Sequence, residues 1–503
     1  MNAITAMSLA VAAVLIGCLD GRFFDAYALW LPIHDFTFTP PSASKDPNCV
    51  RLRGPVGSED AVILEGDLLE GEEPIIIAGE LDAIAHEFTN RQRHGTDAST
   101  SPRGALFAVD RLSRSIPRLT RLEVPLPEGV TDLHTHGLGL HGDVLFAINH
   151  AFRGGGERIE RWRVTRLPDS YMNRMLNVAP VKLTHIGSIT GHDGDANGQG
   201  AWTFTSKLHG SINDIAPVAA HEFFFTQFMD SPVSLDGAGT AGAPPDFVES
   251  NSEHPLTAMI RRWAQKVDVE LFAAALLPPL RRTHIWHCYC ATDPIGDHCA
   301  RTTCEPIGPP GNKWNGIAFR AYTPAGAARA LTGHLYVNDI FRRVTVEFAV
   351  FGTGHSARLE ERRVFRSGFL LDNVHVNNAG DGLWLGGVSV TAPVFWRALA
   401  ALQANATRSY MVAQMAGKEP ARPHTLLRPA EDAPPQPAMT SAALYVDLRS
   451  GRSSVELVQS RWLAGISWSH GVGDKLIMGS PFDDGVLVCP AFRSDSALGM
   501  RVD

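Results

Sequence analysis

The sequence predicts an all-β protein, a six-bladed β-propeller with loop and helical insertions. A short apolar run opened by a pair of small or polar residues recurs six times along the chain. Each time, a turn and a second apolar run follow, which is typical of the paired strands of propeller blades. The composition agrees, because 46 Gly, 33 Pro and a charged fraction of only 19% favour turn-rich β structure.

The recurrent units define the six blades. Their opening pairs are Glu59-Asp60, His136-Gly137, Asn213-Asp214, Asn315-Gly316, Asp372-Asn373 and Ala464-Gly465. Successive openers are farther apart than the roughly 40–50 residues that a bare four-stranded blade needs. The excess predicts insertions, which composition places at 85–103, 180–205, 231–312 and 416–440. In a closed ring, the openers occupy equivalent places and converge on one axis.

The largest predicted insertion, residues 231–312, contains a helical pattern over about 255–276. Its apolar stripe comprises Leu256, Ile260, Trp263, Val267 and Leu271. Such a helix packs as a lid over one face of the ring or lies at a membrane interface. We favour the packed lid.

Residues 1–34 predict a signal peptide or an uncleaved hydrophobic anchor, with the propeller over 35–503. The segment is apolar from Met7 to Leu19, which is too short for a comfortable membrane span. A buried strand or helix is the alternative. We therefore expect the secretory pathway, a secreted or membrane-anchored protein, and membrane or lipid association through the N-terminus. A net charge of −8 argues against a nucleic-acid partner.

The cysteines fit an oxidising compartment. Apart from Cys18 in the apolar run, six of the 7 cysteines remain, an even number. Cys49 and Cys489 lie just outside the first and last repeats, which are neighbours in a ring, so a disulfide there would close it. A second group clusters in one segment, at Cys288, Cys290, Cys299 and Cys304. We favour two local disulfides for this group, with a zinc site as the alternative.

One set of openers offers oxygen ligands to a metal ion. It comprises two carboxylates and three amides, Glu59, Asp372, Asn213, Asn315 and Asn373. Ca²⁺ takes roughly six to eight oxygen ligands, whereas Mg²⁺ demands a small octahedral site. Two carboxylates neutralise the charge of the ion, and the amides complete its shell while leaving room for a substrate oxygen. The set therefore predicts a catalytic calcium site.

A second set of oxygens follows one residue farther along the same axis. Asp60 and Asp214 immediately follow members of the first set, and a backbone carbonyl near Leu138 joins them. This set predicts a second, more enclosed calcium ion. For any single Asp or Asn here, turn capping is the alternative. Four openers with metal-competent oxygens in register favour metal binding.

Two histidines are candidates for acid–base chemistry. His136 opens the second blade in the register of the metal set, and His150 ends the paired strand that follows. Near a metal-bound ester or lactone, they would act as a general base and its support. A structural histidine is the alternative for each. Neither a Gly-x-Ser-x-Gly elbow nor a His-Glu-x-x-His helix occurs in the sequence.

Short motifs follow one another along the chain in a definite order. They are Pro47-Asn48-Cys49, Gly57-Ser58-Glu59-Asp60, His136-Gly137, Asn149-His150, Asn213-Asp214-Ile215, Asn315-Gly316-Ile317 and Asp372-Asn373-Val374. In this order they resemble the paraoxonase (serum paraoxonase/arylesterase) family, over about residues 47–490. The chain departs from that family in its greater length, in its four-cysteine segment and at Gly387-Val388, where the family places a further pocket histidine.

The resemblance implies a six-bladed propeller with two calcium ions in its tunnel. It implies a catalytic ion held by Glu59, Asn213, Asn315, Asp372 and Asn373, and a structural ion held by Asp60, Asp214 and the carbonyl of Leu138. It also implies a His136–His150 dyad, a Cys49–Cys489 disulfide, a retained N-terminal anchor and a helix over the active site.

The combined expectation is a calcium-dependent hydrolase of lactones and aryl esters, with a small-molecule ester or lactone as substrate. Calcium polarises the carbonyl, and a water activated by His136, with His150 behind it, attacks. Glu59 holds the metal and steers the water. Two alternatives are a non-catalytic, calcium-stabilised propeller that acts as a binding module and a strictosidine-synthase-like propeller enzyme.

Overall fold

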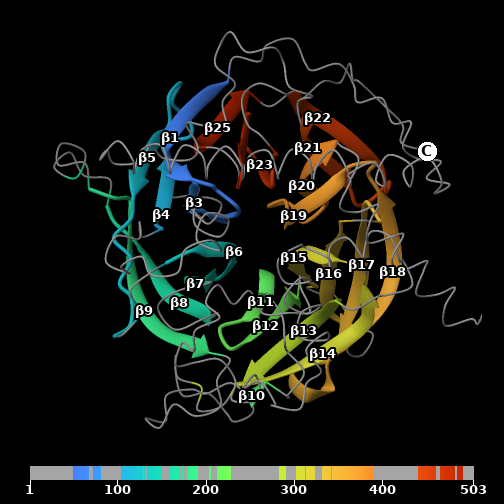
Figure 1. Ribbon diagram of the computed structural model, residues 1–503. Helices are drawn as coiled ribbons and strands as arrows, with labels where there is room; N and C mark the ends of the chain where they lie inside the picture. The colour runs from blue at the N-terminus through green and yellow to red at the C-terminus, as the bar shows by residue number, and fades with distance from the viewer. Residues whose placement is uncertain are drawn as a thin grey trace, which may run out of the picture.

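Six antiparallel sheets surround a central axis and form a six-bladed β-propeller, as Figure 1 shows. This computed structural model confirms the fold class that the sequence predicts. It describes residues 49–66, 72–80, 104–128, 130, 133–149, 158–168, 173, 178–190, 203–204, 212–227, 283–290, 299, 302–311, 313–322, 331–340, 342–389, 440–459, 465–481 and 484–490.

Each blade is numbered by the order of its inner strand. Blade one consists of β2 (Ala61–Leu64), β3 (Ile75–Gly79), β4 (Leu106–Asp110) and β5 (Arg118–Arg121). Blade two consists of β6 (Thr135–His141), β7 (Val144–Asn149), β8 (Arg158–Arg166) and β9 (Val181–Thr190). Blade three consists of β11 (Ile212–Ala219), β12 (Glu222–Gln227), β13 (Thr283–Cys290) and β14 (Thr302–Gly311), with the short β10 (Thr203–Phe204) parallel to β14.

The other three blades complete the ring. Blade four consists of β15 (Trp314–Ala321), β16 (Leu331–Asp339), β17 (Val344–Phe351) and β18 (Arg358–Arg366), with the 3-10 turn Gly354–Ser356 before β18. Blade five consists of β19 (Leu370–Val376), β20 (Gly382–Ser389), β21 (Thr440–Asp447) and β22 (Ser453–Gln459). Blade six consists of β23 (Trp468–Val472), β24 (Lys475–Gly479), β25 (Asp484–Pro490) and β1 (Val50–Val56).

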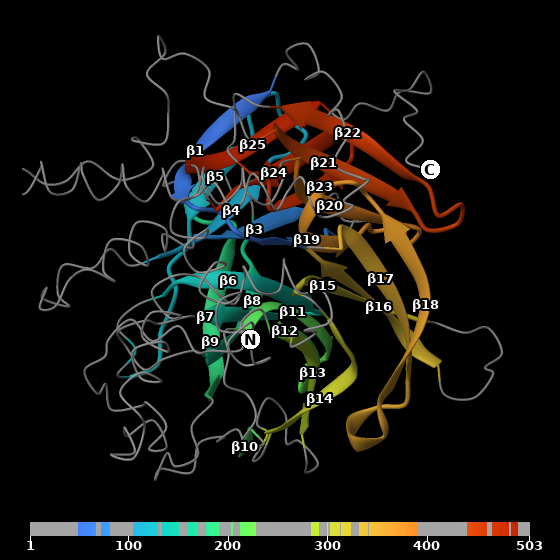
Figure 2. The same ribbon diagram turned by 45° about the vertical axis from the view of Figure 1, so that its right-hand side comes forward.

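Blade six joins strands from distant parts of the chain. Its outermost strand, β1, precedes all of blade one in sequence and pairs antiparallel with β25, beside which it lies in Figure 2. A disulfide between Cys49 and Cys489, separated by 440 residues, links the two strands. The structure thus contains the ring-closing disulfide that the sequence predicts.

The core lies between the blades because alternate residues of each strand face opposite neighbours. In β3, Ile75 and Ile77 pack toward blade two, whereas Ile76 packs toward blade six. In β12, Phe225 packs toward blade two and Phe224 toward blade four. A buried apolar cluster of this kind fills each of the six interfaces. The near-continuous apolar runs in the sequence follow from burial on both faces.

The four-cysteine segment belongs to blade three. Residues 231–312 were expected to be an insertion, but β13 and β14 within that range are the two outer strands of this blade. The two local disulfides that we favoured are present, as Cys288–Cys304 and Cys290–Cys299. The first joins residues directly opposite one another on β13 and β14.

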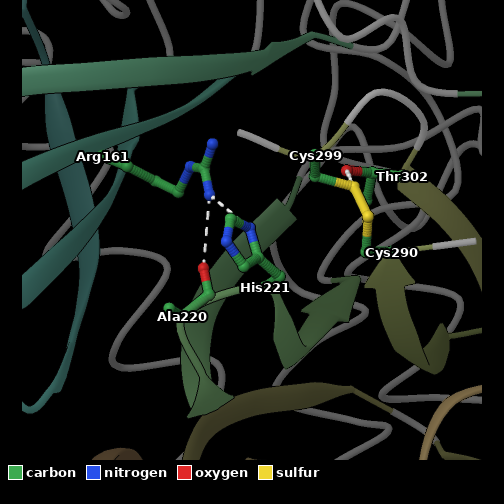
Figure 3. Close-up of a disulfide and its surroundings, with 6 residues drawn as sticks. All are labelled: Arg161, Ala220, His221, Cys290, Cys299 and Thr302. Atoms are coloured by element: carbon green, nitrogen blue, oxygen red, sulfur yellow. Dashed lines mark hydrogen bonds between the residues drawn. A yellow bond between two sulfur atoms is a disulfide. The ribbon is translucent and has the colours of Figure 1, made fainter. Parts of the chain in front are cut away.

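Blades two and three also meet at a polar contact near the second disulfide. Figure 3 shows Arg161 of β8 reaching Ala220 and His221, in the turn between β11 and β12. The Arg161 guanidinium donates a hydrogen bond of 3.2 Å to the Ala220 carbonyl and lies 3.2 Å from His221 Nδ1. The Cys290–Cys299 disulfide lies on the same side of blade three (Figure 3).

Several predicted segments lie outside the described residues. They are the N-terminal segment 1–34, the helix over 255–276, His150, Ala464 and most of the insertions at 85–103 and 416–440. Among the residues that the structure describes, no helix has the length and apolar character needed to cross a membrane.

Candidate functional site

The polar openers lie where the inner strands begin, around the axis that Figure 1 views end-on. Glu59 and Asp60 directly precede β2, and the openers of blades two to five lie within β6, β11, β15 and β19. The inner strands of successive blades therefore bring together residues that are far apart in the sequence.

Each of the four openers that lie within a strand forms a β-bulge. The pairing register shifts between Thr135 and Leu138, Ile212 and Ile215, Trp314 and Ile317, and Leu371 and Val374. Two consecutive residues of the inner strand thus face one residue of its partner, which re-aims their side chains. The bulges explain why adjacent residues such as Asn213 and Asp214 both contribute side chains to the polar groups around the axis.

Glycine follows the first opener residue where neighbouring blades touch. A Cβ on Gly137 would lie 2.4 Å from the Asp214 Cα, and one on Gly316 would lie 2.4 Å from the Asp372 carbonyl oxygen. Such distances are far below van der Waals contact, so only glycine fits at these places. The close approach holds blade two against blade three, and blade four against blade five, at the level of the site.

We call Glu59, Asn213, Asn315, Asp372 and Asn373 the outer set. Glu59 is buried, and its Oε1 lies 3.3 Å from His136 Nε2. Asn213 Nδ2 lies 3.0 Å from the same imidazole nitrogen, and Asn373 Nδ2 donates a 2.7 Å hydrogen bond to the Glu59 carbonyl. These contacts gather blades one, two, three and five around His136.

Three amide oxygens of the outer set have no hydrogen-bond partner. Asn213, Asn315 and Asn373 are 2%, 3% and 0% exposed, and the Oδ1 atom of each is buried without a donor. An unsatisfied buried polar group costs about 1–3 kcal/mol. A hard cation, which takes oxygen atoms as ligands, would satisfy all three groups.

The carboxylates of the outer set interact through their charges. Burial raises the pKa of Asp372 well above its ordinary value, and the negative charges of Glu59 and Asp60 raise it further. A hydrogen bond from the Asn315 side chain acts in the opposite direction. A cation bound between the carboxylates would remove this repulsion, so the outer set fits calcium in both charge and ligand type.

We call Asp60, Asp214 and Leu138 the inner set. Both carboxylates are fully buried, at 0% and 1% exposure. Asp60 Oδ1 and Oδ2 accept hydrogen bonds from the amides of Ala61 (2.8 Å) and Leu138 (2.6 Å). Asp214 Oδ1 and Oδ2 accept from the amides of Ile215 and Ile317, both at 2.7 Å. Leu138, which was expected to offer its carbonyl, contacts Asp60 through its amide nitrogen.

The charges of the two inner carboxyl groups act on each other. Burial raises the pKa of Asp60 to about 8, although the amide hydrogen bonds from Leu138 and Ala61 oppose this shift. Burial and the charge of Asp60 raise the pKa of Asp214 well above its ordinary value. A pair of this kind holds a proton between its members or shares a cation.

Two further histidines lie beside the inner set, and sequence reasoning missed both. His375 of β19 has its Nε2 3.1 Å from Asp60 Oδ1, without the alignment of a hydrogen bond. His470 of β23 contacts the Ala61 carbonyl through Nε2 at 3.0 Å, and the two imidazole rings lie 4.0 Å apart. Burial lowers the pKa of His375 to about 3. Blade six therefore places the His470 side chain beside the inner set.

The outcome for the predicted residues is uneven. The structure brings together the outer set and His136, and it places Asp60 beside both Asp214 and Leu138. His150 lies outside the described residues, so the predicted dyad stays a prediction. Within the described ranges, no three His, Cys, Asp or Glu side chains are arranged to hold a metal ion. The outer set instead combines two carboxylates with amides.

No protein-family model and no curated protein matches this chain. Solved structures with a similar fold include a candidate 6-phosphogluconolactonase from Bacteroides uniformis, 7% identical, with a TM-score of 0.34 over 76% of this chain and 85% of that chain. Another is a candidate oxidoreductase (glucose dehydrogenase) from Thermus thermophilus, 12% identical, with a TM-score of 0.27 over 68% of this chain and 94% of that chain. At these values the matches carry no information about activity.

Proposed function

We propose that this protein is a calcium-dependent hydrolase of lactones and aryl esters. The observation that carries the proposal is the outer set, in which three buried amide oxygens without donors lie with two carboxylates beside His136. Calcium would be held by Glu59, Asn213, Asn315, Asp372 and Asn373. When bound there, it would polarise a substrate carbonyl and stabilise the developing oxyanion.

In this proposal, His136 acts as the general base. Its side chain is 17% exposed and that of Glu59 beside it is 5% exposed, so the imidazole is the more accessible of the two groups. With the Asn213 amide in its present orientation, Nδ2 donates to Nε2, and the ring proton therefore lies on Nδ1. In this tautomer Nε2 is the basic nitrogen, and it would take a proton from water in a substrate complex in which Asn213 Nδ2 no longer donates to it. Glu59, 3.3 Å from Nε2, would stabilise the imidazolium that forms.

A catalytic role accounts for the site better than a purely structural ion does. A structural ion needs no partly exposed imidazole at its edge, and His136 lies within hydrogen-bonding distance of the amide of a predicted ligand. The binding-module and strictosidine-synthase-like alternatives would leave His136 without a chemical task. Both alternatives predict no calcium-dependent ester hydrolysis.

Activity measurements with and without calcium test the proposal. The full-length protein is stripped with a chelator and assayed against lactones, aryl esters and organophosphates. Activity should disappear and return when Ca²⁺ is added, but not when an equal concentration of Mg²⁺ is added. Hydrolysis that persists after exhaustive chelation would exclude this mechanism.

A further inference from the structure

The inner set differs from the outer set in how its oxygens are used. All four carboxylate oxygens of Asp60 and Asp214 accept a backbone N–H at 2.6–2.8 Å. The amide oxygens of Asn213, Asn315 and Asn373 accept none. One lone-pair position of each inner carboxylate oxygen is thus taken by a backbone amide, whereas none is taken on the amide oxygens of the outer set.

An imidazole lies where a second ion would compete for Asp60. His375 Nε2 is 3.1 Å from Asp60 Oδ1. Calcium binds oxygen ligands at about 2.3–2.6 Å and takes oxygens rather than nitrogens, so this imidazole reduces the room and the oxygen ligands available around Asp60. The His375 ring is only 11% exposed and is packed against His470, whose own position is set by the Ala61 carbonyl. A movement of this imidazole away from Asp60 would disturb its packing against His470 of β23.

The backbone hydrogen bonds to the inner carboxylates also argue against a second ion. In the structure, the Leu138 amide donates to Asp60 Oδ2 at 2.6 Å, and the Ile317 amide donates to Asp214 Oδ2 at 2.7 Å. Each inner carboxylate thus forms a hydrogen bond to the inner strand of the next blade. These bonds hold blades one and two, and blades three and four, together at the axis without an ion.

We propose that this chain holds one calcium ion, in the outer set, and that the inner carboxylates are closed by backbone amides and by the His375 imidazole in place of a second ion. The inference rests on the proposed function, because the single ion is the one that the outer set would hold. It also assigns His375 a role in setting the metal content of the ring.

Metal stoichiometry tests this proposal without an activity assay. The chelator-stripped full-length protein is titrated with Ca²⁺ by calorimetry, and calcium, zinc and manganese are measured in the reloaded protein by mass spectrometry. The wild-type protein should bind one calcium ion. His375→Ser should bind two, because the imidazole is gone and its place beside Asp60 is open. The matched control His141→Ser, which removes a histidine at the exposed end of β6, should still bind one.

Each other outcome has a definite meaning. Two calcium ions in the wild-type protein would overturn the proposal and leave the proposed function standing, whereas no bound calcium would overturn both. If His375→Ser binds only one calcium ion, the role assigned to the imidazole is wrong. The role is also wrong if the wild-type protein holds stoichiometric zinc or manganese and His375→Ser loses it. Retention of the outer ion reports that His375→Ser is folded, and His375→Asn, which offers an amide oxygen, serves if the Ser variant does not fold.

Discussion

At the scale of single residues, the amides of the outer set are the most informative groups in the molecule. Folding has buried Asn213, Asn315 and Asn373 and left the oxygen of each without a donor. A sequence selected for stability alone would replace such groups by apolar ones, since an unmade buried hydrogen bond is costly. Their presence supports the proposed calcium site, which leads to different predictions for the stability of the metal-free and the metal-loaded protein.

Asn315→Ala should affect the two states differently. In metal-free protein, the variant loses an unsatisfied amide oxygen but also the hydrogen bond that the amide gives to Asp372, so the two effects oppose each other and the stability should change by no more than about 1 kcal/mol. In calcium-loaded protein, it should lose stability, because the ion is bound less tightly and stabilises the fold less. Thermal unfolding with and without Ca²⁺ measures both effects. An equal loss of stability in both states would argue for an ordinary structural amide.

His136→Gln should lower turnover and leave calcium binding unchanged. The side chain is in contact with Glu59 and Asn213 but is not itself a predicted ligand. Loss of a general base typically lowers the rate by about 10²–10⁴-fold. Ester hydrolysis and calcium content are measured on the same preparation. His141→Gln, at the exposed end of the same strand, is the matched control and should retain full activity.

At the scale of elements, the bulged inner strand is the unit that builds the site. Each bulge places two consecutive residues opposite one partner residue, and the glycine after His136 or Asn315 then meets the backbone of the next blade. Blade packing and site geometry are therefore coupled in the same few residues.

Gly137→Ala should weaken calcium binding as well as the fold. The added methyl group would lie 2.4 Å from the Asp214 Cα, so blade three must shift and carry Asn213 with it. We expect a loss of about 1–3 kcal/mol in unfolding free energy and weaker calcium binding by calorimetry. Gly142→Ala is the control: its φ of +59° makes it strained by about 1 kcal/mol, but nothing lies within 4 Å. Unchanged calcium affinity in Gly137→Ala would contradict the coupling.

Blade four contains a row of polar side chains centred on the buried Glu347 of β17. His334 Nδ1 lies 2.8 Å from Glu347 Oε1, Arg363 of β18 contacts Oε2, and the Tyr336 hydroxyl donates at 3.4 Å. Burial would raise the pKa of Glu347, but the close contacts with His334 and Arg363 outweigh it and lower the pKa to about 2. Glu347 is therefore ionised in the folded protein at neutral pH, and its contacts stabilise blade four in that state.

Glu347→Gln should destabilise the protein at neutral pH and cease to do so in acid. Because the folded pKa of about 2 is below the ordinary 4.5, the contribution of this group is present above 4.5 and is lost as the pH falls through 2. We expect a loss on the order of 1–3 kcal/mol at pH 7. Urea unfolding across this pH range measures it. Glu360→Gln, at an exposed ion pair on β18, should change stability by less than about 0.5 kcal/mol.

At the scale of the whole molecule, the six-bladed ring could be predicted from the sequence. The exact pairing of residues between neighbouring strands could not. Six openers followed by paired apolar runs predict six blades, because this recurrence reports burial on both faces of each strand. The bulges depend on which residues pair across strands, as in Ile215 with Phe225, and a single strand sequence does not contain that pairing. His375 and His470 were missed for the same reason.

The outer strands of blade three were mistaken for an insertion because of their composition. The sequence of β14 contains Pro306, Pro309 and Pro310 with two glycines, which reads as a loop. Proline is tolerated there because β14 is an outer strand that β10 pairs only at Thr303 and Cys304. The two disulfides of this segment hold a strand that its composition would otherwise disfavour.

The ring-closing disulfide should stabilise the protein more than the short one in blade three. Cys49–Cys489 spans 440 residues and Cys290–Cys299 spans 9, so the first restricts the unfolded chain more. Chain-entropy reasoning predicts a loss of up to about 5 kcal/mol for the Cys49→Ser/Cys489→Ser variant and about 3 kcal/mol or less for Cys290→Ser/Cys299→Ser. Guanidinium unfolding of the two variants compares them. Equal losses would show that strain or residual structure outweighs loop length.

The pairing of β1 with β25 also determines how long β1 remains without its native partner during synthesis. At roughly 5–20 residues per second, a ribosome needs about 20–90 s to proceed from Cys49 to Cys489, which are 440 residues apart. Throughout that interval, the hydrogen-bonding edge of β1 and the thiol of Cys49 have no native partner. Nascent chains that meet each other during this time can exchange β1, so dimers linked through Cys49 of one chain and Cys489 of another are the expected misfolded product of rapid overexpression.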